Sequence, residues 1–86
     1  MQAPDWTSRK ILIVEDETSN YKYLEMVLNK TNATIYWAKD GIQAVELCKE
    51  HQPDVILMDI KMPNMDGLEA TRIIKSQYPE IPIIAQ

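Results

Sequence analysis

The chain has 86 residues, of which 45% are hydrophobic and 26% are charged, and this composition describes one small globular domain. The net charge is −4 and no basic run is present, so the segment has no electrostatic footprint for nucleic acid. One cysteine excludes an internal disulfide, and there is neither a signal peptide nor an apolar run long enough to cross a bilayer, so we expect a cytoplasmic domain without a membrane partner.

The first half of the chain predicts a tail, a strand, a helix and a second strand. Residues 1–9 contain a proline and no hydrophobic periodicity, which is typical of a flexible tail or linker. The apolar run 10–14 predicts a strand, and 34–38 predicts another because it is rich in β-branched and aromatic residues. Between them we expect a helix over about 18–30, capped by Thr18 or Ser19, with one apolar face formed by Tyr21, Leu24, Val27 and Leu28.

The second half repeats this alternation. We expect a helix over about 42–51 that ends near His51, with Ala44, Val45 and Cys48 inward, and a strand that ends at Asp59. A third helix begins near Gly67 or Leu68 and buries Ala70, Ile73 and Ile74, and a fourth strand covers 81–85. Strands and helices that alternate with short connections predict an α/β fold with a parallel sheet. Trp37, in the second strand, is expected to be a packing residue.

Two apolar strands end in carboxylates. The uninterrupted run 55–58 predicts a strand buried on both faces, and Asp59 follows it directly. The first strand ends in Glu15 and Asp16 in the same way. If the two strands are parallel neighbours, these acids lie together at the edge of the sheet where open α/β proteins bind ligands. An oxygen-only set of this kind suits Mg²⁺ or Mn²⁺, although acids also cap strand ends and begin helices without a metal.

The motifs around these acids resemble the receiver domain of response regulators in bacterial two-component signalling. The resemblance is carried by 10–16 (KILIVED), Asp40-Gly41 and 53–67 (PDVILMDIKMPNMDG), and it continues in 67–72 and 81–85. It implies a flavodoxin-like parallel sheet with strand order 2-1-3-4-5. It also implies a signalling domain that accepts a phosphoryl group, not an independent enzyme.

The resemblance assigns a role to each acid. Asp59 is implied as the phosphoacceptor, which takes its phosphoryl group from a sensor histidine kinase or a phosphotransfer domain. Asp16 and Asp59 are implied as direct ligands of Mg²⁺, Glu15 as a ligand through water, and the backbone carbonyl of Lys61 as a further oxygen. The ammonium group of Lys61 is expected either to pair with this acidic site or to remain solvated.

The sequence departs from the receiver pattern at its end, Gln86. Receivers have a Thr or Ser after the fourth strand, and then a helix, a fifth strand that ends in Lys-Pro, and a last helix. We therefore expect the receiver domain, residues 10–86, to be incomplete by this helix–strand–helix segment. A fourth strand with an open edge is expected to make the chain dimeric or domain-swapped. The residues before the first strand suggest a receiver from a hybrid sensor histidine kinase.

Three other functions compete with this interpretation. A calcium-binding EF-hand counted from Asp59 fails, because Lys61, Pro63 and Ala70 occupy positions that require oxygen ligands. A phosphatase with an aspartate nucleophile is disfavoured, because Lys61 replaces the second acid of an Asp-x-Asp pattern. A receiver-like docking module that works without phosphorylation, or an inactive fragment, stays open as the alternative function.

Overall fold

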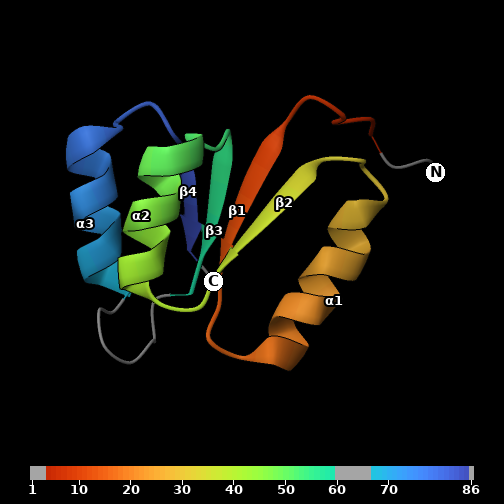
Figure 1. Ribbon diagram of the computed structural model, residues 1–86, viewed down its shortest axis with the longest axis horizontal. Helices are drawn as coiled ribbons and strands as arrows, with labels where there is room; N and C mark the ends of the chain where they lie inside the picture. Colours follow the sequence, from red (N-terminus) through yellow and green to blue (C-terminus); the bar gives the residue numbers. More distant parts are fainter. Residues whose placement is uncertain (1–3, 60–66, 86) are drawn as a thin grey trace.

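The computed structural model describes residues 4–59 and 67–85. Four strands form one parallel sheet in the order β2-β1-β3-β4 (Figure 1). This order is that of the first four strands expected for a flavodoxin-like receiver, so the predicted fold class is confirmed. The strands are β1 (Lys10–Val14), β2 (Thr34–Ala38), β3 (Val55–Met58) and β4 (Ile83–Ala85), and the helices are α1 (Thr18–Asn29), α2 (Gly41–His51) and α3 (Gly67–Gln77).

Helices cover both faces of the sheet, with α1 on one face and α2 and α3 on the other (Figure 1). Side chains alternate along β1 between the two faces, so that Leu12 and Val14 pack toward α2 and α3. Ile11 and Ile13 pack toward α1. Because all four are buried, β1 is the central strand around which both layers of the core are built.

Helix α1 differs from its prediction at two places. Val27 is 43% exposed, because the face that contacts the sheet is formed by Tyr21, Leu24 and Leu28 and leaves Val27 at its border. The N-cap residue is Glu17, whose side chain makes no capping hydrogen bond, so the expected cap at Thr18 or Ser19 is wrong. The side chain of the N-cap residue therefore does not stabilise the start of α1 by a capping hydrogen bond.

Strands β3 and β4 also depart from expectation. Ile56 and Met58 are fully buried, but Val55 and Leu57 are only half-buried, so β3 is not equally covered on its two faces. The reason is that α1 makes its main strand contacts with β2, which is two places away from β3 in the sheet. Strand β4 begins at Ile83 rather than at residue 81, because Pro82 has no N–H for the ladder and contributes only its carbonyl, which accepts from the Ile56 N–H at 3.0 Å.

Residues 4–9 contain neither helix nor strand, and they lie beside the end of the sheet where β1 begins. The Trp6 N–H donates to the Thr31 carbonyl at 2.6 Å, and the Arg9 N–H donates to the Trp6 carbonyl at 2.8 Å. The boundary between a flexible tail and a domain at residue 10 stays a prediction. Within residues 4–59 and 67–85, no helix is long and apolar enough to cross a membrane.

Candidate functional site

The ends of three neighbouring strands are aligned at one edge of the sheet. The register pairs Val14 with Ala38 of β2 and with Met58 of β3, so the residues that follow β1 and β3 emerge side by side. The Glu15 N–H donates to the Ala38 carbonyl at 3.0 Å, and the Asp59 N–H donates to the Val14 carbonyl at 2.9 Å. These bonds extend the ladder by one residue and hold the backbone of both acids at the carboxyl edge of the sheet.

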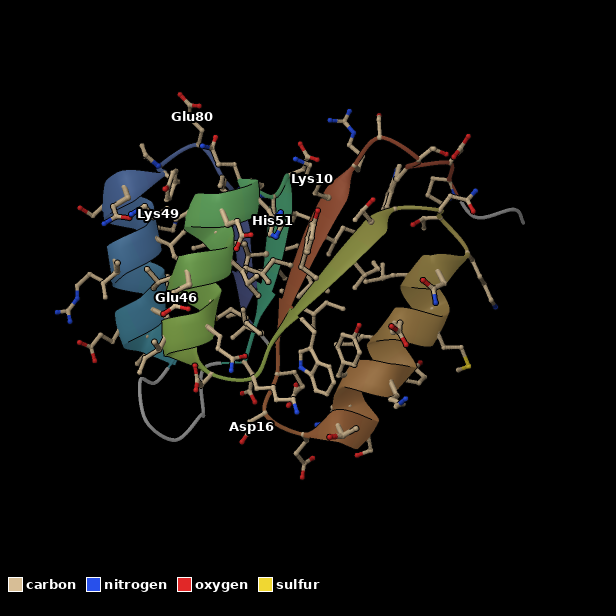
Figure 2. All side chains as sticks on the ribbon, in the orientation of Figure 1. Lys10, Asp16, Glu46, Lys49, His51 and Glu80 are labelled. Atoms are coloured by element: carbon tan, nitrogen blue, oxygen red, sulfur yellow. The ribbon has the colours of Figure 1, made fainter. Side chains whose placement is uncertain are left out.

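This alignment brings the three predicted acids together. Glu15, Asp16 and Asp59 each offer a carboxylate oxygen, and these oxygens all lie within 4.8 Å of one another. Figure 2 shows Asp16 at the end of the sheet opposite to Lys10 and His51. The placement expected from two parallel strands ending in acids is therefore what the structure has, while the role of each acid remains a prediction.

The three carboxylates differ in their surroundings. Glu15 is 4% exposed, Asp59 is half-buried and Asp16 is exposed. Burial raises the pKa of Glu15, and the charge of Asp59 raises it further; the Glu17 N–H, which donates to Glu15 Oε1 at 3.2 Å, opposes the shift without cancelling it. Burial and the neighbouring charge of Asp59 therefore both disfavour the ionised form of Glu15.

Such a cluster fits a divalent cation. The donors are all oxygens, which suits Mg²⁺ or Mn²⁺ better than zinc. Burial and, to a lesser extent, the charge of Asp59 raise the pKa of Glu15, and a bound cation would offset both by favouring its ionised form. The predicted fourth ligand, the carbonyl of Lys61, lies outside the described residues, as do Pro63 and Asp66 of the connection to α3.

One contact of the site was not found from the sequence. The Trp37 indole N–H, near the end of β2, donates to the backbone carbonyl of Glu15 at 2.8 Å. The Trp37 ring stacks on the Tyr21 ring of α1, with the ring centroids 3.9 Å apart and an interplanar angle of 3°. Trp37 was expected only to pack, and no linear spacing could have shown that a residue 22 positions away accepts from it.

Tyr21 has a second interaction, which sequence spacing could have suggested. Its hydroxyl donates to Glu25 Oε2 at 2.8 Å, across the four-residue separation that places side chains together on a helix. Burial, and then this bond to Glu25, raise the pKa of Tyr21 to about 12. The hydroxyl of Tyr21, whose ring stacks on Trp37, is therefore not ionised at physiological pH.

The acid cluster is open beside α1. A hollow of about 420 Å³ is lined by Glu15, Asn20, Tyr23 and Leu24. Tyr23 is 64% exposed, so the wall of the hollow on the side of α1 presents an aromatic ring to solvent. A group that approaches the buried carboxylate of Glu15 from this side meets polar and aromatic side chains.

Comparison with known proteins gives a consistent family. The family described as response regulator receiver domain matches residues 11–86. The receiver domain of a sensor histidine kinase from Pseudomonas aeruginosa PAO1, with a magnesium ion coordinated in its active site cleft, is 39% identical with a TM-score of 0.85. The match covers 90% of this chain and 65% of that one.

Two further solved structures are similar. The response regulator domain of Thermotoga maritima CheB is 34% identical with a TM-score of 0.83, over 90% of this chain and 58% of that one. The N-terminal domain of an uncharacterized protein from Wolinella succinogenes is 36% identical with a TM-score of 0.83, over 90% of this chain and 62% of that one. The chain thus spans about three fifths of the length of these structures.

Proposed function

The chain belongs to the family of response regulator receiver domains, and from this we propose that it takes a phosphoryl group onto Asp59 in two-component signalling. The observation that carries the proposal is the set of three carboxylates, Glu15, Asp16 and Asp59, within 4.8 Å at the carboxyl edge of the sheet. The donor would be a phosphohistidine on a sensor histidine kinase or on a phosphotransfer domain. The domain would then act as a switch in a relay and not as an independent enzyme.

The proposed step is a transfer between two side chains. A carboxylate oxygen of Asp59 attacks the phosphorus; the new O–P bond forms while the P–N bond to the donor histidine breaks. The leaving imidazole keeps the electron pair of that bond and takes up a proton. The backbone bond from Asp59 to the Val14 carbonyl, at 2.9 Å, holds the nucleophile at the strand end, and positioning of this kind is a main source of catalysis in phosphoryl transfer.

We also propose a Mg²⁺ ion, or Mn²⁺, at this site. Asp16 and Asp59 would hold it directly and Glu15 through water, with the carbonyl of Lys61 as a further ligand. When bound, the ion supplies positive charge beside the oxygens of the transferring group. The magnesium in the cleft of the similar Pseudomonas receiver domain supports this assignment.

The first test is phosphorylation by a small donor. The chain is incubated with acetyl phosphate, with Mg²⁺ or with a chelator, and its intact mass is measured. We expect an increase of one phosphoryl group that requires Mg²⁺ and that Asp59→Asn abolishes. Asp54→Asn is the matched control, because Asp54 lies at the other end of β3, where its carboxylate accepts from the Lys10 N–H at 2.8 Å.

The alternative is a receiver-like docking module, or an inactive fragment, that binds its partner without phosphorylation. A folded wild-type chain that gains no phosphoryl group with Mg²⁺ would favour this alternative. An adduct that survives in Asp59→Asn would contradict the assignment of Asp59 while leaving phosphorylation of the chain in place.

A further inference from the structure

Both backbone groups of Glu15 are tied to the end of β2. Its N–H donates to the Ala38 carbonyl at 3.0 Å, and its carbonyl accepts from the Trp37 indole N–H at 2.8 Å. The first of these bonds continues the regular ladder between β1 and β2. The second comes from a side chain and lies just where the ladder ends and the acidic segment begins.

The Trp37 ring is itself held on more than one side. Its face stacks on the Tyr21 ring, with the ring centroids 3.9 Å apart. The Lys39 ammonium lies 4.9 Å from the centroid of the Trp37 ring, within the range of a cation–π interaction. Tyr21 is 7% exposed and is anchored by its hydroxyl bond to Glu25. The indole N–H is therefore presented to the Glu15 carbonyl by a ring that contacts both Tyr21 and Lys39.

We propose that Trp37 is a positioning residue of the metal site, whose indole N–H fixes the backbone between Glu15 and Asp16 so that their carboxylates converge with that of Asp59. The inference deepens the proposed function and rests on its metal site. Rotation about the Cα–C bond of Glu15 turns the Glu15 carbonyl and moves the Asp16 carboxylate relative to that of Glu15. A bond to this carbonyl opposes such a rotation before the cation arrives.

The expected effect is on metal affinity. Without the indole bond, the backbone at Glu15 samples more conformations, and binding a cation must order them. A single hydrogen bond of ordinary strength corresponds to a change of about two- to tenfold in the dissociation constant. In other metal sites, removing a group that orients a ligand lowers the metal affinity by this factor or more.

The test compares two replacements of Trp37 with a matched control. Trp37→Phe keeps an aromatic ring for Tyr21 but loses the N–H. Replacement of Trp37 by benzothienylalanine, which has the shape of tryptophan and no N–H, separates loss of the bond from loss of ring area. Trp6→Phe is the control, because Trp6 lies at the opposite end of β1, in a hollow that it lines with Arg9, Ile11, Asp54 and Val55.

Two readouts are used, and one of them needs no metal. Calorimetry with MgCl₂ should give a dissociation constant about two- to tenfold higher for both Trp37 variants and an unchanged constant for Trp6→Phe. In the metal-free wild-type protein, the Trp37 indole proton should exchange with solvent more slowly than that of Trp6. Thermal melting of each variant shows that the comparison is made between folded proteins.

The outcomes separate this inference from the proposed function. If the wild type binds Mg²⁺ and both Trp37 variants bind it equally well, the positioning role is wrong and the metal site stands. If Trp6→Phe weakens binding as much as the Trp37 variants, the effect is general and the inference is overturned. If the wild type binds no Mg²⁺, the proposed metal site fails and the role of Trp37 fails with it.

Discussion

Glu15 is a carboxyl group whose ionisation depends on the fold, because it is 4% exposed and lies beside the carboxylate of Asp59. Its pKa is raised in the folded chain, so the native state binds its proton more tightly than the unfolded state does. The stabilisation from this proton is fully present below the ordinary glutamate pKa and is lost as the pH rises through the folded pKa. In the absence of metal, Glu15→Gln should therefore raise the free energy of unfolding at pH 7 and flatten its fall as the pH rises above the ordinary glutamate pKa, as measured by urea denaturation.

Mg²⁺ should reverse the effect of Glu15→Gln on the free energy of unfolding. A ligand that binds only the native state stabilises it by about 2.7 kcal/mol when present at a hundred times its dissociation constant. Mg²⁺ favours the ionised form of Glu15, so it should stabilise the wild type more than Glu15→Gln at neutral pH. Equal stabilisation of the two proteins by Mg²⁺ would remove Glu15 from the ligand set and leave only its burial.

Helix α2 shows how a local signal places an element beside the site. The Asp40 carboxylate, at the N-cap, accepts from the Gln43 N–H at 2.8 Å, and Gln43 Oε1 accepts from the Lys39 N–H at 2.9 Å. The first bond satisfies a donor that the helix start leaves open, and the second ties the Gln43 side chain to the backbone of the residue before the cap. Asp40→Ala should destabilise the chain by about 1 kcal/mol in chemical denaturation, whereas Asp40→Asn, which keeps the acceptor oxygen, should change it by only a few tenths. Equal losses in the two variants would show that charge and not capping is responsible.

At the scale of the whole molecule, the prediction of self-association concerns the edge strand β4. Among the residues that the structure describes, β4 pairs with β3 alone, and Ile84 is 53% exposed. A strand with one free side offers N–H and carbonyl groups to another chain. We propose that the chain self-associates through this edge, as a dimer or a domain-swapped pair, so its weight-average mass in sedimentation should rise with concentration.

A pair of substitutions tests this location. Ile84→Lys places a charge on the edge strand and should shift the population toward monomer. Met26→Lys replaces an apolar side chain that is 61% exposed on α1, at the β2 side of the sheet (Figure 1), and should leave association unchanged. A monomer at every concentration in the wild type would contradict the proposal.

The sequence by itself determined the order of elements and the placement of three acids at one edge of the sheet. Apolar runs of four or five residues, separated by segments with helical periodicity, lead to parallel strands, and the ends of parallel strands meet at one edge of a sheet. For that reason Asp16 and Asp59, which are 43 positions apart in sequence, could be placed together without a structure. The cap at Asp40 depends on residues three positions apart and is a local property of the same kind.

Only the tertiary structure decided which parts of these elements are covered and what holds the acids in place. Val27 follows the helical pattern but is exposed, because the position of α1 over β1 and β2 determines its buried face. The bond from Trp37 to the Glu15 carbonyl joins residues on different elements, and a tryptophan in a strand is compatible with packing alone. Such features depend on distances between remote segments, which periodicity along the chain does not encode.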